Sequence, residues 1–215
     1  DCLAKTGTRI VDRLHRQQML GPHSIVVHAV HVDAKEIGTL AETQTFVTHQ
    51  PRSNMNNGVG LPRVEEMLRA GIPVCIGNDG FSNAMWEEWK ATYLAHKLNH
   101  RDPRRLNGGT LFDMAIYNNA ALANTHFKDG ALGVIKPGAA ADLIFVEYYP
   151  YTPLTVDNLP WHMAFGFHES MVTTTIVAGE VLMQDRKLTR LDEEKITNEA
   201  RIYAPKIWEK YRAEF

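Results

Sequence analysis

Three residues that can bind a metal ion or move a proton each follow a short apolar run of the chain. They are His28, His49 and Asp79, preceded respectively by Ile25-Val26-Val27, Phe46-Val47-Thr48 and Val74-Cys75-Ile76. Neutral imidazole and carboxylate are groups that zinc and other divalent metals accept as ligands. Each residue alone has an ordinary structural explanation, a hydrogen-bonded histidine in two cases and a turn-forming aspartate in the third. Their shared position after an apolar run favours, for the set, a site of metal or proton chemistry.

The apolar runs predict three buried strands, over residues 24–28, 45–49 and 74–79. The two segments between them carry apolar residues at helical spacing. Alternation of strand and helix predicts an α/β fold with a parallel sheet. Because the carboxyl ends of parallel strands share one edge, we expect the three candidate residues to converge there. That edge is where (β/α) barrels place catalysis.

The other elements are predicted from helical or alternating spacing and from the positions of Gly and Pro. Asp33 is the expected N-cap of a helix that begins at Ala34. The remaining expectations are a helix over 1–19, a polar loop over 50–60, helices over 61–70, 84–100, 110–117 and 119–127, a hairpin over 130–147 with its turn at 136–138 and a strand over 142–146, a proline-rich loop over 150–160, strands over 171–177 and 181–184, and a final helix from Asp192 kinked at Pro205.

The composition is that of a globular protein, with 215 residues, a formal net charge of −2 and 44% hydrophobic residues. So small a net charge argues against nucleic acid or an anionic membrane as a partner. Two cysteines exclude a disulfide scaffold and favour a reducing cytoplasm. No apolar run approaches the roughly 20 residues of a membrane helix. Because Asp1-Cys2-Leu3 reads as the interior of a helix, we expect the chain to be part of a longer polypeptide.

Four segments carry a family resemblance in combination. They are Val27-His28-Ala29-Val30-His31, His49-Gln50-Pro51-Arg52-Ser53-Asn54, Gly77-Asn78-Asp79-Gly80 and Gly133-Val134-Ile135-Lys136-Pro137-Gly138-Ala139-Ala140-Ala141-Asp142-Leu143-Ile144. Together they resemble successive motifs of the amidohydrolase superfamily, in the branch of chlorohydrolases, guanine deaminase and adenosine-type deaminases. The resemblance covers nearly the whole chain.

This resemblance implies a distorted, TIM-like (β/α)8 metal-dependent hydrolase barrel with a small β-sandwich domain. The three candidate residues would end the sixth, seventh and eighth barrel strands. The expected domains are the C-terminal part of the barrel over 1–127, a portion of the sandwich over 128–190, and a C-terminal helix over 191–215.

The chain departs from the family pattern by what it does not contain. The related enzymes take further metal ligands from a His-x-His on the first strand and a His-x-x-Glu on the fifth, and neither motif occurs here. We therefore expect the C-terminal portion of an enzyme that is inactive alone. The missing N-terminal half would come from the same polypeptide or from a companion chain.

The resemblance assigns chemistry to two of the three residues. Asp79 would bind one divalent ion, zinc or iron, and take a proton from its water. His28 would orient that water or bind the metal as well, and His49 would line the substrate pocket.

Four more residues are candidate substrate contacts. Arg52, Ser53 and Asn54 follow the second strand and could equally hold their loop. Trp86 could edge the pocket or belong to the core of the helix over 84–100.

The expected function is hydrolytic deamination at a C–N bond of a nitrogen heterocycle by metal-activated water. Hydrolytic dechlorination or opening of a cyclic amide on the same scaffold is one alternative. A non-catalytic subunit that uses the sandwich and final helix for association is another. The expected partners are a small heterocyclic substrate and the N-terminal half, with no nucleic acid and no membrane, and a homodimer remains open.

Overall fold

The computed structural model of the protein describes residues 1–214 and divides into two compact units. The first consists of Asp1–Ala140 and Tyr149–Glu169, and the second of Ala141–Tyr148 and the chain from Ser170 on. The first unit thus extends beyond the boundary at 127 and includes a later segment. The predicted assignment of barrel, sandwich and helix domains stays a prediction.

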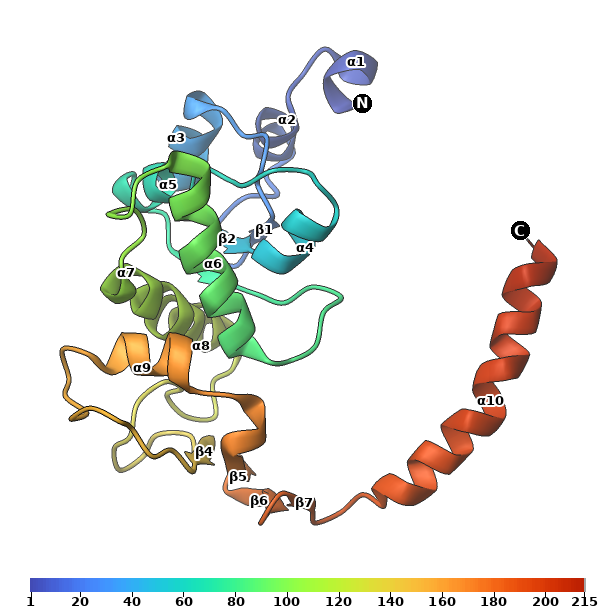
Figure 1. Cartoon of the computed structure of the whole chain (residues 1–215). Coiled ribbons are helices and arrows are strands. Elements are labelled where there is room, and N and C mark those ends of the chain that lie inside the picture. The colour runs from blue at the N-terminus through green and yellow to red at the C-terminus, as the bar shows by residue number, and fades with distance from the viewer. Residues whose placement is uncertain (215) are drawn as a thin grey trace. The chain divides into compact units, whose positions relative to one another are not determined.

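A three-stranded parallel sheet lies at the centre of the first unit, in the order β1-β2-β3 (Figure 1). The strands are β1 (Ile25–Val27), β2 (Phe46–His49) and β3 (Val74–Ile76). The helices that connect them are α3 (Ala34–Glu42), then α4 (Pro51–Asn56) and α5 (Val64–Arg69). The sheet and the order of its strands confirm the prediction from alternating apolar runs and helical segments.

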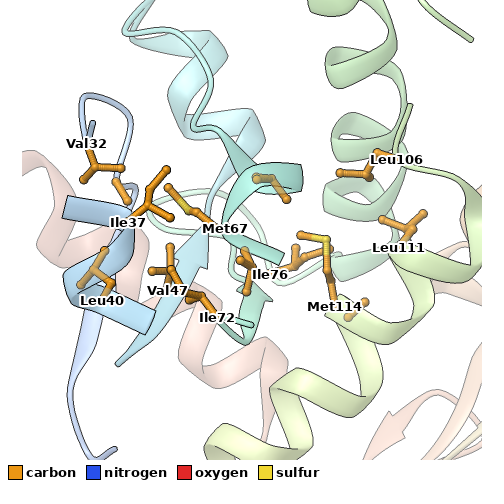
Figure 2. Close-up of a cluster of buried hydrophobic side chains, with 14 of the residues drawn as sticks. Val32, Ile37, Leu40, Val47, Met67, Ile72, Ile76, Leu106, Leu111 and Met114 are labelled. Carbon is orange, nitrogen blue, oxygen red and sulfur yellow. The ribbon is translucent and has the colours of Figure 1, made fainter. Parts of the chain in front are cut away.

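The core of this unit forms where the central strand meets its helices (Figure 2). Val47 on β2 and Val74 on β3 are completely buried, as are Leu40 on α3 and Met67 on α5. Burying one such side chain stabilises the fold by roughly 1.5–3 kcal/mol. The carboxyl ends of β2 and β3 are therefore firmly positioned.

Helices after β3 cover the sheet and largely match the predictions. They are α6 (Met85–His100), α7 (Gly108–Phe112), the π-helical segment η1 (Asp113–Asn118) and α8 (Asn119–His126). The predicted cap of α3 is also present, because the Asp33 carboxylate accepts the Glu36 N–H at 2.9 Å and the Glu36 side chain accepts the Asp33 N–H at 3.1 Å.

β1 is an exposed edge strand, which corrects the prediction that all three strands are buried. Ile25 and Val27 are 43% and 52% exposed, and within residues 1–214 no strand pairs with the outer side of β1. An apolar run predicts that the side chains of a strand are able to be buried. Whether the chain covers both of its faces is decided by packing partners far away in sequence.

The opposite edge of the sheet is occupied by two amide side chains. Asn119 donates to the Ile76 carbonyl oxygen at 3.0 Å and accepts the Ile76 N–H at 3.0 Å. Asn118 donates to the Val74 carbonyl oxygen at 2.9 Å. These bonds take the place of those that a neighbouring strand would make with β3.

Two predictions in the first half of the chain were wrong. The segment 1–19 is not one helix but two, α1 (Cys2–Thr6) and α2 (Ile10–Arg16), because Gly7 adopts a left-handed φ of 65° and ends the first. The segment 50–60 is not simply a loop, because its first part folds as α4, with Pro51 in the first turn.

After residue 128 the predicted hairpin is wrong, and one helix was not predicted. No hairpin forms over 130–147; within it an isolated parallel bridge joins Ala131 to Ala139. The predicted loop over 150–160 is present as far as Asn158, where α9 (Leu159–Gly166), which was not predicted, begins. α9 packs against α7 so closely that a Cβ at Gly108 would lie 2.7 Å from the Trp161 ring.

The second unit contains a four-stranded antiparallel sheet in the order β4-β5-β6-β7 and a long helix. The elements are β4 (Leu143–Val146), β5 (Val172–Val177), β6 (Glu180–Gln184), β7 (Lys187–Leu188) and α10 (Glu193–Glu214). Strands β4, β5 and β6 and the start of α10 confirm the predictions. Across residues 1–214, no helix is long and apolar enough to cross a membrane.

Candidate active site

His28 and Asp79 meet beyond the carboxyl ends of the outer strands of the parallel sheet. His28 Nε2 lies 3.5 Å from Asp79 Oδ2, although β2 separates the two strands. Both residues have a left-handed backbone, with φ of 65° and 54°. Such conformations are uncommon for residues with side chains and cluster at functional sites. The predicted convergence of these two residues is confirmed.

Two consecutive residues of α4 each contact one member of this pair. Ser53 Oγ donates to Asp79 Oδ2 at 2.6 Å. Asn54 Oδ1 lies 2.8 Å from His28 Nδ1. Ser53 and Asn54 are 4% and 1% exposed, whereas the side chains of His28 and Asp79 are 38% and 42% exposed. The pair therefore faces solvent while its supports are enclosed in the protein.

The environment of Asp79 favours its ionised form. The hydrogen bond from Ser53, aided by the Gly80 N–H and by His28, lowers the pKa of Asp79 below its usual range. The carboxylate is thus charged at neutral pH. It can accept a proton or bind a cation.

His49 does not join the pair and instead lies wholly inside the protein. Its Nε2 is 3.2 Å from His96 Nε2 on α6, and both side chains are nearly fully buried. Burial, followed by the nearby His96 and His28, holds the pKa of His49 well below its usual range. Burial likewise lowers the pKa of His96 to about 4. The two rings are therefore neutral at pH 7, and each can donate to or accept from the other.

Arg52 is bound by acidic and carbonyl groups of the protein itself. Its Nε donates to Glu88 Oε1 at 2.6 Å, and a guanidinium nitrogen donates to the Ser82 carbonyl oxygen at 2.7 Å. A further contact is made with Glu87, and the guanidinium lies 5.2 Å from the centre of the Phe81 ring. In this arrangement Arg52 fastens its own segment, the start of α4, to the loop after Asp79 and to α6. The loop-holding alternative has this support, and a substrate contact for Arg52 stays a prediction.

Trp86 packs against other aromatic side chains of its unit. Its ring meets that of Phe167 edge to face, with centroids 5.2 Å apart, and it lies beside the buried core. This position agrees with the alternative that Trp86 belongs to the core. A role for Trp86 at the edge of the substrate pocket stays a prediction.

Three residues at the site were not predicted from the sequence. Gln50 is 5% exposed and reaches between strands: its Nε2 donates to Thr48 Oγ1 at 2.6 Å, and its Oε1 accepts the His28 N–H at 3.2 Å. Glu88 and His96 are buried on α6, where they pair with Arg52 and His49. Their spacing of eight residues puts both on one helix face, which is the signal that could have identified them.

An open groove of about 750 Å³ runs from this site along the exposed face of β1. Residues of β1 and α2 line it, and His28 and Asn54 are among its walls. His28 is thus accessible from the side of the sheet that β1 leaves uncovered.

A model of the amidohydrolase family matches residues 1–182. The chain belongs to the amidohydrolase family. Its position there agrees with the resemblance of the four sequence segments, all of which lie within the matched residues.

Relatives within the amidohydrolase family are deaminases by name. A 5-methylthioadenosine/S-adenosylhomocysteine deaminase of Haloarcula marismortui is 36% identical over 196 residues, which are 89% of this chain and 44% of the relative. A 5'-deoxyadenosine deaminase of Methanosarcina mazei is 33% identical over 191 residues, covering 87% of this chain and 43% of the relative.

A solved structure of an adenosine deaminase from Xanthomonas campestris with bound zinc superimposes with a TM-score of 0.84 at 25% identity. It covers 96% of this chain, and this chain covers 47% of it. The chain spans a little under half the length of the relatives that it matches.

The donor set of this amidohydrolase site fits part of a metal centre. A carboxylate and an imidazole nitrogen 3.5 Å apart can both bind one divalent ion. Within residues 1–214, no three His, Cys, Asp or Glu side chains gather as a metal site. His28 and Asp79 can therefore supply two ligands, and a complete coordination sphere needs others.

Proposed function

We propose that this chain is the C-terminal portion of a metal-dependent aminohydrolase that removes an amino group from an adenosine-type ring. The observation that carries the proposal is the solvent-facing pair His28–Asp79, held by Ser53 and Asn54. The names of the relatives support deamination of a purine nucleoside or a derivative of one.

We also propose that β1, β2 and β3 are the sixth, seventh and eighth strands of a (β/α)8 barrel. Their parallel order and the meeting of site residues at the carboxyl ends support this assignment. The open outer side of β1 gives the preceding strand a place to pair. The antiparallel sheet of the second unit would be the later part of the sandwich.

In the proposed reaction, Asp79 and His28 would hold one divalent ion, zinc or iron, together with ligands from the rest of the protein. When bound, such an ion supplies the positive charge that makes a water molecule acidic near neutral pH. Asp79 is ionised and partly exposed, so it can accept a proton at a carboxylate oxygen. His28 faces the same space through Nε2 and can orient the water by accepting its hydrogen bond.

The test is substitution of Asp79 by Asn in the full-length protein, assayed for ammonia release from adenosine-type nucleosides. Asn keeps the size of the side chain but removes the charge and the proton acceptor. The rate should fall by several orders of magnitude while the far-ultraviolet circular dichroism is unchanged. Asn56→Ala, on the exposed side of α4, is the matched control and should keep the wild-type rate.

Near-normal ammonia release by Asp79→Asn would overturn the assignment of Asp79. Release of halide, or ring opening without ammonia, would instead indicate a dechlorinase or a cyclic amidase on the same scaffold. Absence of any hydrolysis by the full-length wild type across these substrate classes would favour the non-catalytic subunit.

A further inference from the structure

Residues 53 and 54 of α4 support the candidate site through one polar atom each. Ser53 contacts Asp79, and Asn54 contacts His28, at 2.6 and 2.8 Å. Both side chains are more than nine-tenths buried. Because they are consecutive residues of one helical turn, any shift of that turn moves both supports together.

We propose that Asn54 is a positioning residue that selects the tautomer of His28, and that Ser53 is its counterpart for Asp79. This inference rests on the proposed function of the pair. Asn54 Oδ1 can only accept a hydrogen bond, so neutral His28 carries its proton on Nδ1. The lone pair of His28 is then on Nε2, the nitrogen that faces Asp79.

The choice of tautomer decides what the pair can do. With the proton on Nε2, His28 would donate to Asp79, and the two groups would satisfy each other. With the proton on Nδ1, two acceptors lie 3.5 Å apart. Such a pair is stable only when a cation or a hydrogen-bond donor lies against both atoms. Asn54 thereby prevents His28 and Asp79 from hydrogen-bonding to each other and leaves two acceptors that can bind a ligand.

Burial argues that Ser53 and Asn54 support the site without touching substrate. Asn54 is 1% exposed, and its Oδ1 is occupied by His28. Ser53 Oγ donates to Asp79 and accepts from Asn57 Nδ2 at 3.4 Å. The polar atoms that a substrate would need on these residues are therefore either occupied or, like Asn54 Nδ2, enclosed in the protein.

The deciding experiment reads the tautomer directly. Full-length protein labelled with ¹⁵N-histidine and stripped of metal by a chelator is examined by two-bond ¹H–¹⁵N correlation spectra at pH 8. The His28 signals are assigned by their loss in His28→Gln. In the wild type we expect the proton on Nδ1. In Asn54→Asp, whose carboxylate is also only an acceptor, we expect the same tautomer. In Asn54→Leu we expect the proton on Nε2.

Asn56→Leu is the control, because Asn56 is an exposed residue of the same helix, and it should keep the wild-type tautomer. A proton on Nε2 in the wild type would overturn the proposal, as would an unchanged tautomer in Asn54→Leu. Since these spectra need no turnover, they test the positioning role even if the proposed reaction fails. If Asn54→Leu does not fold, the wild-type spectrum still decides, because a proton on Nε2 there overturns the proposal.

Steady-state kinetics of the metal-loaded protein separate positioning from substrate contact. Ser53→Ala and Asn54→Leu should lower kcat roughly 10- to 100-fold and leave KM within a factor of about two. A raised KM with unchanged kcat would show that the side chains bind substrate, and the positioning role would fall.

Discussion

At the scale of single residues, burial separates two histidines that look alike in the sequence. His28 and His49 both follow an apolar strand, but His28 is partly exposed and faces Asp79, whereas His49 is enclosed and faces His96. The difference arises because His49 ends the central strand, which is covered on both faces, and His28 ends an edge strand. Position within the sheet thus sets which imidazole is available for chemistry.

Replacing His49 by Ala should therefore affect stability more than catalysis. The change removes a buried ring and leaves His96 without its partner, which should cost about 2–4 kcal/mol of unfolding free energy. Turnover of the folded full-length variant should fall far less than in Asp79→Asn. Urea unfolding and ammonia release on the same preparations measure both quantities. Complete loss of turnover in folded His49→Ala with near-normal Asp79→Asn would reverse these roles.

The buried pair also predicts acid sensitivity. The pKa of His96 is about 4 in the folded protein, against an ordinary value of 6.5 that applies when the chain unfolds. The unfolded state therefore binds more protons below pH 6.5. The stability that neutral His96 contributes is complete above that pH and is lost as the pH falls toward 4. At about 1.4 kcal/mol per unit of pKa, the loss approaches 3 kcal/mol.

His96→Gln cannot titrate at this position and should reduce the pH dependence between 6.5 and 4, while the buried His49, whose pKa is also lowered, keeps its own contribution. His15→Gln, at an exposed position of α2, is the control and should retain the wild-type slope. Unfolding midpoints measured across the pH range give the comparison. Equal slopes for the wild type and His96→Gln would show that this histidine does not control acid stability.

At the scale of elements, helix α6 holds the site in place through two of its buried side chains. It carries Glu88 and His96, which bind Arg52 and His49 on either side of the turn from β2 into α4. The position of that turn sets the positions of Ser53 and Asn54 on α4. The burial of Glu88 raises its pKa, and the hydrogen bonds from Arg52 act in the opposite direction and favour the charged form.

Breaking this ion pair should cost far more than breaking an exposed one. Arg52→Ala leaves the fully buried Glu88 carboxylate without its cation, and we expect a loss of roughly 3–5 kcal/mol in unfolding free energy. Arg63→Ala removes the exposed partner of Glu66 on α5 and should cost about 0–1 kcal/mol. Chemical denaturation of the two variants side by side tests the difference, and equal losses would exclude a bracing role for α6.

Helices and strands could be predicted from the sequence where their apolar residues repeat at regular spacing. Short helices were harder to predict. The strands and α6 follow from their side-chain patterns. By contrast, α4 and α9 are six and eight residues long, too short to be stable from intrinsic propensity, so tertiary packing decides them. The π-helical turn at Asp113–Asn118 likewise has no local signal. The helix-face spacing of Glu88 could have marked it as a candidate, but its partner Arg52 lies 36 residues away and could not be identified from local spacing.

At the scale of the whole molecule, the chain brings together two residues that fit part of a metal centre. His28 and Asp79 were predicted to meet because parallel strands share a carboxyl edge, and they do so at 3.5 Å. The exposure of β1 could not be predicted from its apolar run, since it depends on what lies beyond the edge of the sheet.

Metal retention should therefore differ between this chain and the full-length protein. The chain of residues 1–215 should lose zinc on dialysis and release no ammonia, because two ligands bind a divalent ion weakly. The full-length protein should retain about one equivalent. Elemental analysis after dialysis gives the comparison. A stoichiometric ion held by residues 1–215 alone would show that these residues complete a site by themselves.

The two asparagines bound to the outer edge of β3, at the end of η1 and the start of α8, have a consequence for how copies of this chain can associate. Exposed strand edges are templates for pairing with another chain. Asn118 and Asn119 already occupy backbone groups of Val74 and Ile76, so within residues 1–214 the β1 edge of this sheet is the one left open to a second chain. Two copies joined through β1 would present a blocked edge at each end. Polymerisation through this sheet therefore stops at a pair and cannot propagate into a fibril.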